Sequence, residues 1–96
     1  MKQIADITLD NQTLYLIGDL DFYNVMSVYE KSLVLLKNNP AYHIDFSGLK
    51  TSDSAGIALI LEWLKLAKHH HKKIQLNNLS ANLQSIANVS GLRELL

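Results

Sequence analysis

Apolar and polar positions alternate in a way that predicts strands at the start of the chain. Imperfect alternation over residues 4–9 and regular alternation over 13–17 predict two short strands. The polar residues 10–12 between them are typical of a turn, so the two strands are expected to pair as a hairpin. The segment 18–21, Gly-Asp-Leu-Asp, is expected to break the second strand.

The rest of the chain switches between helical and strand-like spacing of apolar residues. Asp21 is expected to be the N-cap of a helix over residues 22–37 that stops at 38–40, Asn-Asn-Pro. The remaining expected elements are a strand over 42–46, a loop over 47–53, a helix over 54–69, a strand over 74–76, a helix over 81–89 capped by Ser80 with Gly91 at its C′ position, and a short extended tail over 93–96.

This order, β-β-α-β-α-β-α, is typical of an α/β domain. Strands separated by helices favour a mixed sheet with parallel β-α-β crossovers. The chain shows no internal repeat, linker or low-complexity segment, so residues 1–96 are expected to form a single domain.

Composition narrows the function classes. Hydrophobic residues make up 48% of the chain, which argues against disorder, and nine basic residues balance nine acidic ones, unlike a nucleic-acid binder. The chain has no cysteine, which excludes disulfides and thiolate metal sites. The longest apolar run, residues 55–61, is too short to insert into a membrane, and no secretory signal is recognised. These features predict a soluble, cytoplasmic protein.

The helix over 54–69 is apolar over an unusually wide arc. Leu59, Trp63 and Leu66 widen its apolar face to roughly 220°, where a surface helix needs roughly 100°. The helix is either deeply buried under the sheet, or one edge of the arc faces a partner. Trp63 fits both interpretations, because tryptophan is common in cores and at interface centres.

The start of this helix carries the best candidate site. Ser52 or Asp53 is expected to cap it, leaving free backbone amides near Ser54. A phosphate on the Ser54 hydroxyl would suit this position, although serine in a first turn is more often only a capping element. Gly56 is a poor helix former, which indicates close approach by another part of the chain or by a partner.

Other chemistry is poorly supported. The three consecutive histidines at 69–71 point in different directions at a helix end, which is not a metal-ligand arrangement. Ser52 occupies a position where the G-x-S-x-G nucleophile elbow needs glycine, and no phosphate-binding glycine loop is present. We therefore expect no catalytic residue, metal or cofactor, although a small enzyme or ligand binder stays as a third hypothesis.

Separated motifs resemble the STAS domains shared by anti-anti-sigma factors and sulfate transporters. The main motif is Ile44-Asp45-Phe46-Ser47-Gly48-Leu49 followed by Ser52-Asp53-Ser54-Ala55-Gly56-Ile57-Ala58-Leu59. It is accompanied by Gly18-Asp19-Leu20-Asp21, Asn78-Leu79-Ser80 and Ser90-Gly91-Leu92. The resemblance covers nearly the whole chain and implies the SpoIIAA-like fold, with helices packed mainly on one face of a mixed sheet.

Within this family, residues 52–63 most resemble the MlaB group, the cytoplasmic STAS subunits of the Mla phospholipid ABC transporters of Gram-negative bacteria. The resemblance implies a non-catalytic subunit that binds an MlaF-like ATPase. Through that ATPase it would associate with an MlaE-like permease and an MlaD-like lipid-binding subunit, peripheral to the inner membrane. Such a complex maintains the lipid asymmetry of the outer membrane.

The resemblance also implies site residues. The residues expected to bind the partner are Ser52, Asp53, Ser54, Ala55, Gly56, Ile57 and Ala58. In anti-anti-sigma factors the residue matching Ser54 is phosphorylated, so a phospho-switch at Ser54 is the alternative function, with Asp19 and Asp21 as nearby acidic residues. Ala55 stands where anti-anti-sigma factors commonly have a second serine, which favours the MlaB group. From the residues alone, Asp19 and Asp21 are a turn residue and a helix cap.

Overall fold

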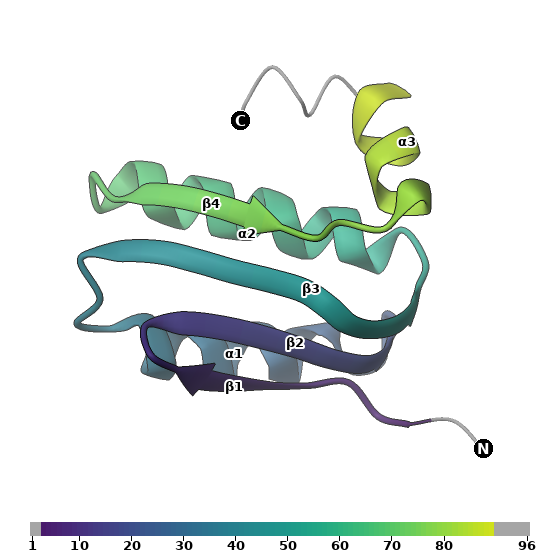
Figure 1. Ribbon diagram of the computed structural model, residues 1–96, viewed down its shortest axis with the longest axis horizontal. Coiled ribbons are helices and arrows are strands. Elements are labelled where there is room, and N and C mark those ends of the chain that lie inside the picture. The colour runs from purple at the N-terminus through teal and green to yellow at the C-terminus, as the bar shows by residue number, and fades with distance from the viewer. Residues whose placement is uncertain (1–2, 90–96) are drawn as a thin grey trace.

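The computed structural model describes residues 3–89 and contains the predicted order of elements (Figure 1). The elements are β1 (Asp6–Asp10), β2 (Thr13–Leu20), α1 (Val25–Leu36), β3 (Ala41–Ser52), α2 (Ala55–His69), β4 (Lys73–Asn77) and α3 (Ala81–Val89). The strands form one four-stranded sheet in the order β1-β2-β3-β4. β1 is antiparallel to β2, whereas β2, β3 and β4 are parallel, so the predicted mixed sheet with a hairpin and crossovers is confirmed.

Two layers make the core. α1 and α2 lie side by side behind one face of the sheet, and α3 lies beyond the end of β4 (Figure 1). The alternating strand residues that point to the helices are buried, among them Ile7, Leu14, Leu16, Ile44 and Phe46. Register pairs Leu14 with Ile44 and Ile44 with Leu76, so apolar side chains of adjacent strands stand next to one another on the helix-facing side.

Trp63 on α2 fills the centre of this core. It is completely buried, its ring meets that of Phe46 edge-on at 6.1 Å, and its Nε1–H donates to Ser32 Oγ on α1 at 2.9 Å. Leu59 is equally buried, so this part of the wide apolar arc of α2 packs against the sheet and α1. The wide arc is therefore explained mostly by burial, and Trp63 is a core residue.

The predicted ends of the second and third strands are wrong. β2 does not break at Gly18 but continues to Leu20, and β3 runs through the predicted loop 47–53 as far as Ser52. Register shifts after Tyr15 and after Gly18 keep the two strands paired to Leu20 and Ser52. Gly18 adopts a φ of +87°, and a side chain there would lie 2.8 Å from the Ile4 carbonyl oxygen. This glycine serves a close backbone approach inside a continuing strand.

The first helix begins later than predicted. It starts at Val25 instead of residue 22, and Asn24 occupies its N-cap position. The Asp21 carboxylate accepts the amides of Tyr23 and Asn24, and the Asn24 side chain in return accepts the amide of Asp21. Asp21 therefore stabilises a turn that precedes the helix, and it is not the helix N-cap itself.

The other boundaries agree with the prediction to within two residues. α3 spans the predicted residues, and Ser80 Oγ caps it by accepting the Leu83 amide at 3.1 Å. The first strand begins at Asp6 instead of residue 4, and Ile4 forms only an isolated bridge with Asp19. Gly91 and the tail over 93–96 lie outside the described residues. No helix within residues 3–89 combines the length and apolar character needed to cross a membrane.

Candidate protein-interaction site

The connection from β3 to α2 is fixed by short polar contacts. Asp53 Oδ1 accepts the amide of Ala55 at 2.8 Å, so of the two predicted capping residues it is Asp53 that satisfies a free amide of the first turn. The Ser52 hydroxyl instead donates to the Asp53 carbonyl oxygen at 2.9 Å. Ser54 stands at the N-cap position, and its hydroxyl makes no capping hydrogen bond. This hydroxyl is therefore left available to a partner.

The predicted partner-binding residues 52–58 divide by exposure. Asp53, Ser54 and Ala58 are exposed, and Ser52 is half-buried. Three of the seven point inward: Ala55, Gly56 and Ile57 are buried. The side chains that can meet another molecule are thus those of the exposed residues, while the buried ones hold the start of α2 against the rest of the domain.

Gly56 is explained by packing inside the domain. A Cβ at this position would run into the Ser52 hydroxyl and would lie 3.0 Å from Leu83 Cδ2 on α3. The absent side chain therefore lets α3 and the end of β3 approach α2 closely. Of the two explanations that the sequence allows for this glycine, the close approach is by another part of the chain.

The two acidic residues assigned by resemblance lie on the same end of the molecule as Ser54. Asp19 Oδ1 accepts a hydrogen bond from Thr51 Oγ1 at 2.6 Å, and Asp19 Oδ2 accepts the Gln3 amide at 2.7 Å. Asp19 thus connects the ends of β2 and β3, just before the cap of α2. Asp21 is engaged in the turn before α1. Both carboxylates have defined structural roles beside the candidate site.

A groove between α1 and α2 extends the surface beyond the predicted residues. It holds about 410 Å³ and is lined by Val25, Met26, Tyr29, Ala58, Leu59 and Glu62. Burial, and then the negative charge of Glu62, raise the pKa of Tyr29 above its ordinary value. Ala58 belongs both to the groove and to the exposed start of α2. The groove therefore runs directly from the Ser54 region onto α1.

Large apolar side chains are exposed in this groove and in the segment just before α1. Phe22 and Met26 are each 61% exposed, and Tyr23 is 97% exposed. Analysis of the sequence did not identify these residues as part of a site. The sequence pattern did not mark them as exposed, because Phe22 and Met26 stand seven and three residues before Tyr29, at the helical spacing of the predicted buried face. Contiguous exposed apolar residues of this kind are typical of protein interaction surfaces.

Few kinds of side chain surround Ser54. The side chains beside Ser54 are carboxylates, hydroxyls and apolar groups, and the sequence's run of histidines lies at the opposite end of α2. Within the part of the chain that the structure describes, no group of three or more histidine, cysteine or acidic side chains could hold a metal ion. The exposed features at this end are a hydroxyl, an apolar groove and a few carboxylates, which suit contact with another protein.

Comparisons with known proteins agree with this architecture. A family model described as the MlaB STAS domain matches residues 5–96. The anti-sigma factor antagonist SpoIIAA in its unphosphorylated form is similar in structure, with a TM-score of 0.65, 18% identity and coverage of 85% of this chain and 79% of that one. A serine-to-glutamate variant of RsbS from Moorella thermoacetica has a TM-score of 0.61 at 17% identity, covering 97% of this chain and 78% of that one. No curated protein matches the chain significantly.

Proposed function

Because this chain belongs to the MlaB family of STAS domains, we propose that it is a non-catalytic subunit of an MlaFEDB-type phospholipid ABC transporter. In this proposal the domain binds the MlaF-like ATPase in the cytoplasm and supports its assembly and activity. The MlaE-like permease and the MlaD-like lipid-binding subunit associate with it through the ATPase. The domain would thereby contribute to the maintenance of outer-membrane lipid asymmetry.

The continuous surface from Ser54 into the α1–α2 groove is the observation that supports this proposal. Ser54, Ala58 and Glu62 are spaced four residues apart on α2, so they form one exposed row. The groove beside this row is mostly apolar and its lining includes Tyr29 and Met26, and tyrosine and methionine are enriched at interfaces. If the ATPase buries this surface only in its assembled form, then binding of this domain shifts the ATPase population toward that form.

Substitution of Ser54 tests the proposed interface. Ser54→Arg and Ser54→Glu place a long or charged side chain at an exposed position, so both should abolish co-purification with the ATPase while thermal melting changes little. Ser85→Arg is the matched control, because Ser85 is an exposed helical serine on α3. Normal ATPase binding by both Ser54 variants would show that the interface lies elsewhere.

A phospho-switch is the second candidate function. Its specific support is the exposed Ser54 hydroxyl, which makes no capping hydrogen bond and lies at a helix N-terminus, where a phosphate's negative charge is tolerated. Intact-mass analysis of protein from its native cells tests it. A singly phosphorylated population mapped to Ser54 supports the switch, and its absence under all growth conditions argues against it.

Affinity purification from native membranes separates the two functions. The full-length chain is tagged, extracted in mild detergent, and its partners are identified by mass spectrometry. Recovery of an ABC ATPase together with its permease supports the transporter subunit. Recovery of a soluble kinase-like ATPase and a sigma factor supports the phospho-switch instead.

A further inference from the structure

A second distinctive surface lies at the end of the molecule opposite Ser54. Residues 65–73 contain four lysines, three histidines and no acidic residue, although the whole chain has zero net charge. They form the last turns of α2, the connection to β4 and the first residue of β4 (Figure 1). We call residues 65–73 the basic pole.

Two hollows with apolar floors flank the basic pole. The first, of about 230 Å³, lies between the ends of α1 and α2, and its lining combines Leu33, Leu36, Tyr42 and Leu66 with Lys37, His70 and Lys72. The second, of about 530 Å³, lies between α2 and β4, and its lining combines Leu61, Leu64, Ala67 and Ile74 with Lys65, Lys68 and Lys72. Lys72 stands between the hollows because it lines both.

Among the described residues, 3–89, most of the positive charge of these linings has no acidic partner. Lys65 Nζ forms an exposed ion pair with Glu62 Oε1 at 3.5 Å, but within residues 3–89 neither Lys68 nor Lys72 makes an ion pair. The described lining of both hollows contains no acidic side chain. The pole therefore presents lysine ammonium groups around apolar floors, and an occupant that matches it must be both acidic and apolar.

We propose that the basic pole binds an acidic, amphipathic peptide segment of a partner protein. Apolar side chains of the segment enter the two hollows, and its carboxylates pair with Lys68 and Lys72. A short amphipathic segment presents both kinds of side chain at regular spacing, which is how helix-in-groove recognition works. Because the floors are recessed, the specificity comes from side chains that reach into the hollows between the lysines.

The recessed floors favour a peptide over a membrane surface. A membrane-binding surface inserts projecting apolar side chains into the boundary of the acyl chains. At the basic pole most of the apolar lining is recessed: Leu36, Tyr42 and Ala67 are almost fully buried, and of the apolar lining residues only Leu33 is exposed, at 38%. A flat anionic surface would meet the lysines but would leave the apolar floors unfilled, whereas peptide side chains fill them.

This site is separate from the proposed ATPase-binding surface. α2 has 15 residues, so its two ends are roughly 20 Å apart, and Ser54 and Lys72 lie beyond opposite ends of the helix. The two surfaces can be occupied together. The peptide site does not depend on the identity of the protein that binds at Ser54.

Fluorescence anisotropy with a defined peptide tests the proposal. The probe is a fluorescein-labelled synthetic helix with glutamates and leucines at amphipathic spacing, titrated with the full-length chain. We expect saturable binding that Lys72→Glu weakens at least about tenfold. Lys50→Glu is the matched control, because it makes the same charge change at an exposed position near the other end of the molecule, and it should change affinity less than about twofold.

Control ligands separate the peptide from other occupants. A peptide with serine in place of each leucine should lose binding, and so should one with lysine in place of each glutamate. Equal binding by Lys72→Glu, or full binding of the serine peptide, overturns the proposal. So does binding of phosphatidylglycerol vesicles without binding of the peptide, or binding of neither. Circular dichroism verifies folding, and Lys68→Glu at an exposed position replaces Lys72→Glu if the latter does not fold.

Discussion

A buried hydrogen bond between Trp63 and Ser32 connects α2 to α1. Ser32 and Trp63 are both completely buried, Trp63 Nε1–H donates to Ser32 Oγ, and the serine donates in turn to the Tyr29 carbonyl oxygen at 2.5 Å. Ser32→Ala leaves the indole N–H unpaired in the core, so we expect a loss of about 1–3 kcal/mol in the free energy of unfolding. In a Trp63→Phe background the same change should cost much less. Urea denaturation of the four proteins measures this coupling, and equal costs in both backgrounds would contradict it.

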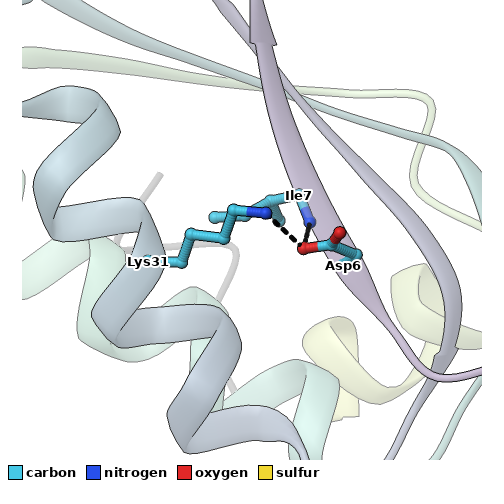
Figure 2. Close-up of polar contacts among 3 residues, drawn as sticks. All are labelled: Asp6, Ile7 and Lys31. Atoms are coloured by element: carbon cyan, nitrogen blue, oxygen red, sulfur yellow. Dashed lines mark hydrogen bonds and ion pairs between the residues drawn. The ribbon is translucent and has the colours of Figure 1, made fainter.

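An exposed ion pair joins α1 to the edge strand β1. Lys31 Nζ and Asp6 Oδ1 are 2.8 Å apart, and the hydrogen bond from Lys31, followed by that from the Ile7 amide, lowers the pKa of Asp6 below its ordinary 3.8 (Figure 2). Since the lowered pKa belongs to the folded state, the stabilisation is complete above about pH 4 and is lost as pH falls through the lowered value.

Asp6→Asn measures what this ion pair contributes. Both side chains are about half exposed, so we expect Asp6→Asn to lose less than about 1 kcal/mol at neutral pH. The difference between the two proteins should shrink as pH falls from about 4 towards about 2. Urea unfolding across this range provides the measurement. A difference that grows with acidity would mean that Asp6 is not stabilised in its charged form.

At the scale of elements, the Asp53 side chain stabilises the start of α2, whereas the neighbouring Ser54 hydroxyl makes no capping hydrogen bond. Asp53 Oδ1 accepts the Ala55 amide at 2.8 Å, so Asp53→Ala should cost about 0.5–2 kcal/mol in stability. Asp53→Asn keeps an accepting oxygen and should stay within about 0.5 kcal/mol of the parent. Asp10→Ala, at an exposed hairpin position, is the control for loss of an acidic side chain. Chemical denaturation that ranked Asn and Ala alike would argue against capping by Asp53.

Element order was predictable from the sequence, but the extent of the strands was not. Local spacing carries the type of each element, which is why α2 and α3 were placed within a residue of their observed ends. The continuation of β2 through Gly18 depends on pairing with β3, a strand distant in sequence, across two register shifts. Read from its neighbours in the sequence alone, Gly18 indicates the end of a strand. Only the pairing with β3 shows that β2 continues beyond it.

The candidate site was predictable in part for the same reason. Ser54 and Asp53 belong to a contiguous motif at a helix start, so the sequence could identify them together. The groove joins α2 to α1, and Tyr29 and Met26 lie beside Ala58 only because the two helices pack side by side. Such a surface depends on tertiary packing, and the sequence pattern does not show which apolar residues of the first helix remain exposed.

At the scale of the whole molecule, one core connects both layers. Its buried residues come from the first three strands and all three helices, and Ile74 and Leu76 of β4 pack against them. The radius of gyration, 12.4 Å, is that of a single compact unit of this length. Nothing in this packing divides the sheet from the helices, so we expect them to unfold together.

The chain's only tryptophan makes this cooperative unfolding measurable. Trp63 lies in the core between α1, α2 and the sheet, so its fluorescence reports the tertiary packing, whereas far-ultraviolet circular dichroism reports helices and strands. Because both signals depend on the same core, their urea transitions should have the same midpoint and slope. Loss of the tryptophan signal at a lower urea concentration would mean that α1 and α2 separate from the sheet first. The α1–α2 groove would then not persist as a preformed surface, and binding there would have to include its formation.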